Sequence, residues 1–231
     1  YLIKPITEGV LLTRLNRVWH KKQIFRLIDQ AYAEKDYLRA ARLCDAAIEG
    51  HKAHELDLLR MKAKLMEKSG EPVKAREVYE RVLEQREYQW ARAGIAKIRM
   101  ANGEFEQARQ AFQSVIAENR YYIDAYDQLA LTYQNLGKLD EACAVLERAA
   151  KLSPNSVPRQ RNLGNVALFI GDHERAAVVL REALERLRER SDASAAALTR
   201  LAWAELCLVR GSLDEALATL DAGLAELPDD R

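Results

Sequence analysis

The sequence has few residues that form a covalent framework or interrupt a chain. Among 231 residues there are three cysteines, five prolines and ten glycines. Cys44, Cys143 and Cys207 lie far apart, which excludes a dense disulfide framework and any C-x-x-C metal or redox pair. We expect three small buried thiols in a protein of a reducing compartment.

Long apolar runs are lacking as well. No stretch approaches the roughly 20 apolar residues that a membrane-spanning helix needs, and no secretory signal is visible. The sequence therefore predicts a cytoplasmic protein that makes no membrane contact.

A charge excess of one sign and catalytic motifs are also missing. The formal net charge is +1, so no overall field favours nucleic acid, which we do not expect as a partner. The chain has no Gly-rich phosphate loop and no G-x-S-x-G elbow. No cysteine or further histidine lies near His51 and His54 in sequence, and an exposed turn is expected there. We expect no enzymatic activity, no cofactor, no metal and no small-molecule substrate.

What the sequence does contain is an internal repeat of about 34 residues. Each copy has an alanine followed four residues later by a larger side chain, with the alanines 35, 33, 34, 34 and 40 residues apart. The six copies are Ala40-x3-Cys44, Ala75-x3-Tyr79, Ala108-x3-Phe112, Ala142-x3-Leu146, Ala176-x3-Leu180 and Ala216-x3-Leu220. A period of this length indicates stacked two-helix units.

The fourth copy shows the pattern of one unit most clearly. Its first helix is predicted by a stripe of apolar residues three, four and seven apart, which share one helix face: Tyr126, Leu129, Ala130 and Tyr133. Gly137 follows where that helix must turn. Asp140 and Glu141 suit the start of a second helix, and Pro154 suits its end. The unit therefore reads as two antiparallel helices joined by a tight turn.

The repeat resembles the tetratricopeptide repeat over residues 21–231. The resemblance implies an all-α fold, a right-handed superhelical solenoid of about six two-helix repeats that binds other proteins. The first copy departs from the pattern because Lys35 stands where the turn glycine is expected. The interval of 40 predicts a longer second helix in the fifth copy, through residues 185–190, before Ser191 caps the next helix.

The first twenty residues follow another pattern. Tyr1-Leu2-Ile3 reads as a strand, Lys4-Pro5 follows, and residues 7–20 read as an amphipathic helix with Val10, Leu11, Leu15 and Val18 on one side. This resembles the last strand and helix of a response-regulator receiver domain. The resemblance implies that Lys4 would contact an aspartyl phosphate and that the bond before Pro5 could be cis. The alternative is that the chain begins with apolar residues that have no relation to a receiver domain.

This interpretation divides the chain into a receiver remnant, residues 1–20, and a repeat array, residues 21–231. Residues 7–34 have no glycine after Gly9 and no proline, so one long helix can join the two. Residues 1–26 carry six cations against the single acid Glu8, a net +5, which leaves −4 for the remaining chain. Apolar residues on this helix form a patch that favours self-association, so we expect either a homodimer through it or a mobile N-terminus.

The tetratricopeptide resemblance also implies where a partner binds. In that family, repeat positions 2, 5, 9, 12 and 13 of the first helix line a concave groove. Our groove candidates are Arg60, Lys64, Trp90, Lys97, Gln134, Asn135, Arg161, Asn165 and Phe169; the same positions also hold Asp57, Glu67, Lys68 and Asp127. Cations and amides suit a peptide's carboxylates and backbone, and the aromatics suit its apolar side chains.

One segment, Arg161-Asn162-Leu163-Gly164-Asn165, is similar to the carboxylate-gripping segment of chaperone-binding repeats. That clamp needs an asparagine in the next first helix, where this chain has Ala202, so the clamp is incomplete. We predict a protein-interaction scaffold, the output module of a bacterial two-component response regulator in a phosphorelay. The alternative is a free-standing co-chaperone or assembly scaffold without a receiver.

Overall fold

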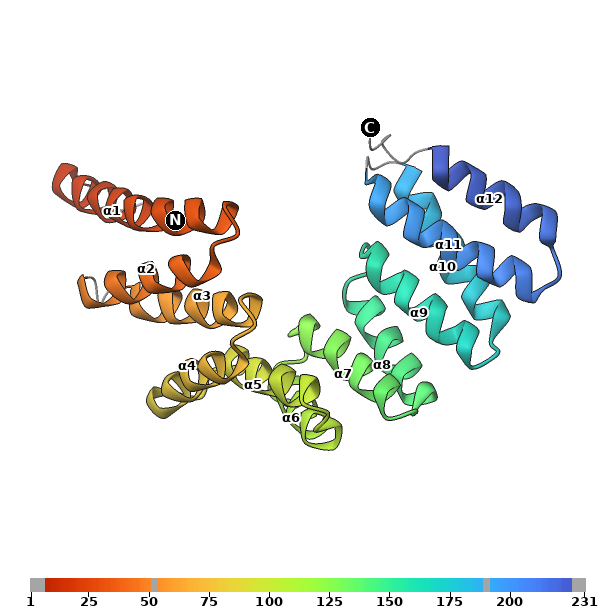
Figure 1. The fold of residues 1–231 in the computed structure, drawn as a ribbon, viewed down its shortest axis with the longest axis horizontal. Coiled ribbons are helices and arrows are strands. Elements are labelled where there is room, and N and C mark those ends of the chain that lie inside the picture. The colour runs from red at the N-terminus through yellow and green to blue at the C-terminus, as the bar shows by residue number, and fades with distance from the viewer. Residues whose placement is uncertain (1–6, 51–53, 189–191, 226–231) are drawn as a thin grey trace. The chain divides into compact units, whose positions relative to one another are not determined.

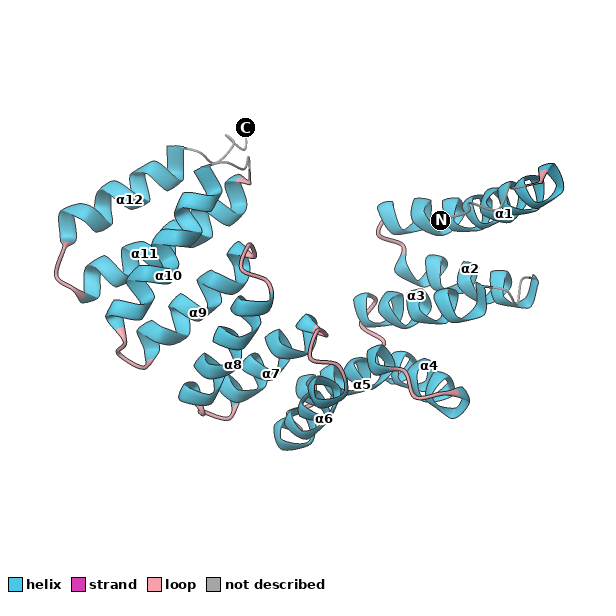
Figure 2. Cartoon of the chain, turned by 180° about the vertical axis from the view of Figure 1, so that it is seen from behind, coloured by secondary structure: helices cyan, strands magenta, loops and turns pink. Residues whose placement is uncertain are grey.

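The computed structural model describes residues 7–50, 54–188 and 192–225 (Figure 1). These residues form twelve α-helices and no strand (Figure 2). The helices are α1 (Glu8–Ala33), α2 (Tyr37–Gly50), α3 (Glu55–Lys68), α4 (Pro72–Gln85), α5 (Gln89–Ala101), α6 (Phe105–Glu118), α7 (Ile123–Asn135), α8 (Leu139–Leu152), α9 (Val157–Phe169), α10 (His173–Arg188), α11 (Ala193–Val209) and α12 (Leu213–Ala225). The all-α repeat fold predicted from the sequence is confirmed.

The odd-numbered helices are the first helices of six units, and each even-numbered helix is the second helix of its unit. A residue with positive φ stands in the turn of every pair: Lys35, Gly70, Gly103, Gly137, Gly171 and Gly211. After α7, the Gly137 N–H donates to the Gln134 carbonyl at 3.0 Å and the Lys138 N–H donates to the Tyr133 carbonyl at 2.9 Å. This pair of bonds is a Schellman motif, which closes the helix end and reverses the chain.

Small residues let the paired helices approach closely. The repeated alanines, Ala40, Ala75, Ala108, Ala142, Ala176 and Ala216, are all buried. At Gly94 a Cβ atom would lie within 2.2 Å of the Tyr79 ring, and at Gly164 it would lie within 2.6 Å of Leu180. The stripe of α7 that was predicted to be buried, which includes Tyr126 and Leu129, is buried. The predicted register is therefore confirmed.

The chain divides into two compact units, residues 1–98 and residues 99–231. In the first, side chains of α1 to α5 share one core that includes Ile28, Leu58, Leu59 and Tyr79. In the second, successive helices from α6 to α12 contact one another, and α11 also contacts α9. Smaller apolar clusters, such as the one around Ala177 and Leu206, form its core.

The interval of 40 residues is absorbed by two long helices. α10 has 16 residues and α11 has 17, whereas α7 and α9 have 13 each. α10 reaches Arg188, as predicted, but Asp192 caps α11, with its side chain accepting a hydrogen bond from the Ala195 N–H at 3.0 Å. The prediction that Ser191 is the cap is wrong, because α11 begins at Ala193, directly after Asp192, and the N-cap is the residue that precedes the first helical one.

The N-terminal helix runs unbroken from Glu8 to Ala33, as predicted. Val10, Leu11, Leu15 and Val18 are exposed, but so are Leu12 and Trp19, so apolar residues are not confined to one side of it. The strand predicted at Tyr1–Ile3, and Lys4 and Pro5 with it, lie outside the described residues. α1 crosses residue 20, and the boundary between residues 1–20 and 21–231 stays a prediction.

The three cysteines are buried and unpaired, as expected from their spacing. Burial, with the neighbouring Asp45 carboxylate, raises the pKa of the Cys44 thiol to about 12. Burial also raises the pKa of Cys207. No helix in the described part of the chain is both long and apolar enough to cross a bilayer.

Candidate protein-binding surface

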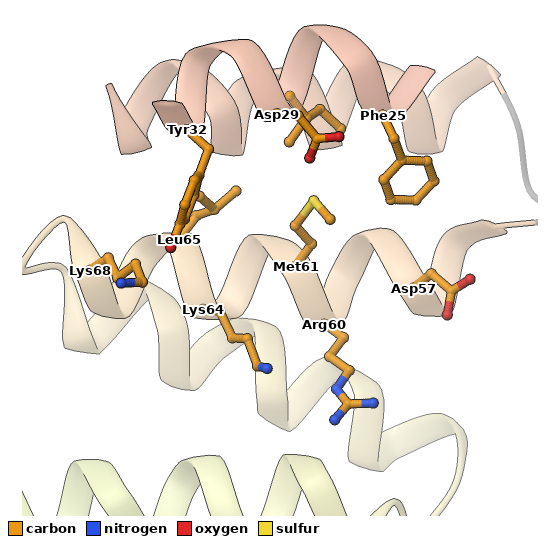
Figure 3. Close-up of a pocket in the computed structure, with 10 residues that line it drawn as sticks. Phe25, Asp29, Tyr32, Asp57, Arg60, Met61, Lys64, Leu65 and Lys68 are labelled. Atoms are coloured by element: carbon orange, nitrogen blue, oxygen red, sulfur yellow. The ribbon is translucent and has the colours of Figure 1, made fainter. Parts of the chain in front are cut away.

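A groove of about 610 Å³ lies between the first helices of the first two units (Figure 3). α1 supplies Phe25, Ile28, Asp29 and Tyr32, and α3 supplies Asp57, Arg60, Met61, Lys64, Leu65 and Lys68. These residues belong to one compact unit of the chain. The groove therefore has a geometry that a ligand could use without any contribution from the second unit.

The α3 side of the groove carries a row of cations. Arg60, Lys64 and Lys68 are spaced four residues apart and are all exposed. Four residues of helix rise about 6 Å, so the three charges lie along one face at that interval. Figure 3 shows Arg60 and Lys64 extending from α3 on the side away from α1. The row offers three positive charges to a chain that lies along the helix.

Aromatic rings hold two of these cations. The Arg60 guanidinium lies 5.6 Å from the Trp90 ring centroid, and the Lys68 ammonium lies 5.6 Å from the Tyr32 ring and 5.8 Å from the Tyr37 ring. Cation–π contacts of this kind orient a long side chain without neutralising its charge. Both cations are therefore positioned and remain available to an anion.

The floor between the two helices is apolar. Figure 3 shows Phe25 and Tyr32 directed from α1 toward α3, where Met61 and Leu65 lie. Asp29 and Asp57 also line the groove, so its lining carries three cations and two carboxylates. Such a surface suits a peptide that combines an apolar residue with acidic ones.

Two of the nine predicted groove residues, Arg60 and Lys64, line this groove together, and Trp90 lies beneath Arg60. Trp90 also packs edge-on against Tyr79, with ring centroids 5.9 Å apart, so it supports the fold as well. Lys97 is half-buried on α5 and lines no part of this groove. Glu67, another groove position, accepts a hydrogen bond of 2.8 Å from the Tyr79 hydroxyl.

The sequence prediction missed the α1 side of the groove. Phe25, Asp29 and Tyr32 occupy positions 5, 9 and 12 of the first copy when Lys35 is aligned with the turn glycines. The first copy has Lys35 in place of the turn glycine, so its first helix could not be aligned with the other copies from the sequence pattern. Extending the alignment by one unit would have found all three.

In the second unit the predicted residues are more scattered. Asn135 donates from Nδ2 to the Leu131 carbonyl of its own helix at 2.8 Å, and Asp127 is bonded to Arg159. Gln134 and Arg161 are half-buried, and Phe169 is 77% exposed. The Oδ1 atom of Asn165 is buried with no hydrogen-bond partner in the described part of the chain. Ala202, where a carboxylate clamp needs asparagine, is buried.

Repeat positions 2, 5, 9, 12 and 13 of the sixth copy form an apolar surface that the sequence prediction did not include. Counted from the turn at Gly211, they are Leu198, Leu201, Glu205, Leu208 and Val209, all exposed on α11. α11 contacts α9, which carries Phe169. This surface of α11 is thus apolar with one central carboxylate, whereas the corresponding surface of α3 is rich in cations.

Nothing in the described residues resembles a metal centre, since no group of three His, Cys, Asp or Glu side chains could hold an ion. Of the two histidines in the predicted turn, His54 stands at the start of α3 and His51 lies outside the described residues. The carboxylate with the clearest perturbation is Glu106, whose pKa is lowered by hydrogen bonds from Arg109 and Lys138. All three are on the exterior of the second unit, where they act as a surface ion-pair network.

Family comparisons agree with this architecture. Three family models described as Tetratricopeptide repeat match residues 70–130, 121–189 and 161–231. Tetratricopeptide repeat protein 8 of Mus musculus is 29% identical over 84 residues, which are 36% of this chain and 16% of that protein. The chain therefore matches only a small part of this curated relative.

Solved structures show the same fold. A thermophilic TPR protein of Thermus thermophilus has a TM-score of 0.58 at 25% identity, over 74% of this chain and 91% of that one. BtubC from P. vanneervenii has a TM-score of 0.68 at 17% identity, over 88% and 95%. YrrB, a TPR protein with an unusual peptide-binding site, has a TM-score of 0.58 at 19% identity, over 82% and 95%. With the repeat register, the paired helices and the turns, these matches show that the chain is a tetratricopeptide-repeat protein.

Proposed function

We propose that this chain is a protein-interaction scaffold that binds an acidic segment of a partner protein in the groove between α1 and α3. The observation that carries the proposal is the row of Arg60, Lys64 and Lys68 beside an apolar floor. Charge-assisted hydrogen bonds to carboxylates contribute about 1.5–3 kcal/mol when partly buried and much less when exposed. The apolar floor would add affinity by excluding water from one anchor side chain. The scaffold itself performs no chemistry.

The geometry of the row favours an extended ligand. Cations on α3 recur about every 6 Å, and alternate residues of an extended chain recur about every 6.6 Å. Acidic residues at every second position would therefore meet successive cations. The TPR protein YrrB has a peptide-binding site, which is consistent with a peptide ligand here.

The apolar surface of α11 is a second contact region within this proposal. Leu198, Leu201 and Leu208 recur at helical spacing on α11, with Phe169 on the neighbouring α9. A surface of this kind suits an amphipathic helix. Arg161, which is half-buried on α9, would supply a polar contact to it.

Peptide binding measured by fluorescence anisotropy tests the groove. Labelled peptides that alternate glutamate with leucine or serine are compared with lysine-for-glutamate versions, at low and high salt. Lys64→Glu should weaken binding of the acidic peptide at least about tenfold, because it replaces the central attraction with repulsion. Lys151→Glu is the matched control, since Lys151 is exposed on α8 of the other unit. Equal affinity for Lys64→Glu and the parent would remove the groove from the proposal.

A more specific candidate is that the scaffold is the output module of a bacterial response regulator. The observation that favours it is the exposure of Val10, Leu11, Leu15 and Val18 on α1, which a preceding receiver domain would cover. The upstream part of the gene tests this directly. It should encode a domain of about 100–150 residues with a phospho-acceptor aspartate. A gene without such a domain leaves the free-standing scaffold as the remaining alternative.

A further inference from the structure

Asp29 is the one charged side chain among the described α1 residues that line the groove between α1 and α3. The α3 side carries Arg60, Lys64 and Lys68, with Asp57 near the start of that helix. Asp29 is exposed, and its carboxylate forms no ion pair and no hydrogen bond within the part of the chain that the structure describes. The groove thus has a negative charge on one side and mainly positive charges on the other.

An aspartate is unfavourable at this position of α1. Asp29 is the fifth residue from the C-terminal end of the helix. A carboxylate there has a low helix propensity and lies close to the negative end of the helix dipole. Other aspartates of the same unit have a structural task that Asp29 lacks among the described residues. Asp36 accepts a hydrogen bond of 2.9 Å from the Arg39 N–H. Asp45 pairs with Lys62 at 2.6 Å. Residues that weaken their own helix in this way are expected at functional positions.

Two aromatic rings flank Asp29 on the same face of α1. Phe25 lies four residues before it and Tyr32 three residues after it, so the three side chains form one stripe along the groove. Figure 3 shows all three directed from α1 toward α3, with Asp29 in the middle and opposite Met61. A carboxylate between aromatic rings suits a lysine or arginine side chain. The carboxylate attracts the cation, and the rings attract it through cation–π contacts and cover its methylene groups.

We propose that the α1 side of the groove selects a basic residue in the bound segment and that Asp29 determines this specificity. The inference rests on the proposed function, which places an acidic segment along α3, and it adds that this segment is not uniformly acidic. Successive side chains of an extended chain point to opposite sides. When alternate acidic residues meet the cations of α3, the residues between them therefore face α1. The residue that meets Asp29 is basic, and the residues that meet Phe25 and Tyr32 are apolar.

The level of Asp29 along the groove gives the order of charges in the ligand. Figure 3 shows Arg60 and Lys64 on either side of Met61, which lies opposite Asp29. The basic residue of the ligand would therefore stand between two acidic ones, with an apolar residue beyond each. Leu-Glu-Lys-Glu-Leu is the simplest segment with this order. A uniformly acidic segment would instead place a like charge against Asp29, which disfavours binding.

Fluorescence anisotropy with three labelled peptides tests the inference. The first is Ser-Leu-Glu-Lys-Glu-Leu-Ser, whose sequence reads the same in both directions, and the other two have glutamine or glutamate in place of lysine. The parent chain should bind the lysine peptide at least about fivefold more tightly than the glutamate peptide, with the glutamine peptide between them. Three cations and two carboxylates line the groove, a net +1 that by itself favours the most acidic peptide, so this order requires a local contact. The difference should shrink with added salt.

Charge reversal at Asp29 should reverse the order of affinities. Asp29→Lys should bind the glutamate peptide at least about fivefold more tightly than the lysine peptide, because an ammonium group replaces the carboxylate. Asp57→Lys is the matched control, since it changes the charge of the same groove by the same amount at a different place. It should keep the lysine peptide as the tightest ligand. Both positions are exposed, so circular dichroism should show the helix content of the parent.

The outcomes separate this inference from the proposed function. The specificity assigned to Asp29 is overturned if Asp29→Lys still prefers the lysine peptide, or if Asp57→Lys reverses the order as well. Binding in the groove stands in either case when Lys64→Glu weakens the binding of all three peptides. Both proposals fail if Lys64→Glu binds the peptides as tightly as the parent, or if none of the peptides binds the parent at concentrations up to about 1 mM.

Discussion

Arg159 on α9 and Asp127 on α7 form a two-point ion pair. The Arg159 Nε atom donates to Oδ1 of Asp127 at 2.8 Å, and its Nη2 atom donates to Oδ2 at 2.7 Å. The Arg159 residue is only 8% exposed, so the carboxylate is the main compensation for a nearly buried cation. The pair joins the first helices of two consecutive units, 32 residues apart in sequence.

Removal of this carboxylate should destabilise the protein strongly. Asp127→Ala leaves the Arg159 guanidinium buried without its counter-charge, and we expect a loss of about 2–4 kcal/mol in the free energy of unfolding. Urea denaturation followed by circular dichroism measures it. Asn162→Ala, an exposed change on α9, should cost less than about 0.5 kcal/mol. Equal midpoints for the two variants would show that the pair contributes little.

A methyl group at Gly94 should disrupt the packing of α5 on α4. The added Cβ atom would lie 2.2 Å from the Tyr79 ring, which is 3% exposed and cannot move aside easily. We expect Gly94→Ala to cost about 1–3 kcal/mol in the free energy of unfolding. Gly9→Ala is the matched control, because no atom lies within 4 Å of its Cβ position and the residue is helical. Gly9→Ala should leave the free energy of unfolding unchanged or raise it by up to about 1 kcal/mol. Thermal melts measure both variants. Equal melting temperatures would show that Gly94 does not lie against Tyr79.

Glycine at position 35, in the turn between α1 and α2, should raise the stability of the protein. Lys35 has a φ of 59°, whereas the five corresponding turns have glycine with φ between 71° and 81°. A side chain in this left-handed region costs roughly 1–2 kcal/mol, part of which is offset by the greater freedom of glycine in the unfolded chain. Lys35→Gly should therefore stabilise the protein by about 0.5–1 kcal/mol. Calorimetry that shows a lower melting temperature for this variant would contradict the prediction.

The buried thiol of Cys44 should make stability depend on pH in the alkaline range. Its pKa is about 12 in the folded protein and 9.0 without the fold, so the unfolded chain loses this proton first. The corresponding stability is fully present below pH 9 and is lost as the pH rises from 9 through 12. Cys44→Ala should reduce the loss between about pH 8 and about pH 10.5, measured by urea denaturation.

Reactivity gives an independent measurement of the same thiol. The folded protein should not react at Cys44 with a thiol reagent at about pH 8, because only the thiolate is nucleophilic and the residue is fully buried. The reaction should become rapid in denaturant. Modification of Cys44 at the same rate with and without denaturant would show that the site opens readily.

The sequence by itself determined the unit of this fold. Alanines at an interval near 34, turn residues such as Gly137 and apolar stripes such as that of α7 are local patterns, set by helix period and backbone freedom. Helix α1 and the lengthened α10 could be predicted for the same reason. These features depend on neighbours within about one helix length, so they can be read along the chain.

Only the tertiary structure decided which side chains line the candidate groove. Arg60 and Lys64 of α3 line one groove with Phe25, Asp29 and Tyr32 of α1, a set that no single copy of the repeat contains. Other predicted groove positions are already engaged: Asp127 by Arg159, and Trp90 partly by Tyr79. The pattern marks positions that face one side of a helix. Whether such a side chain is free to bind depends on partners far away in the sequence, which only the folded chain brings near.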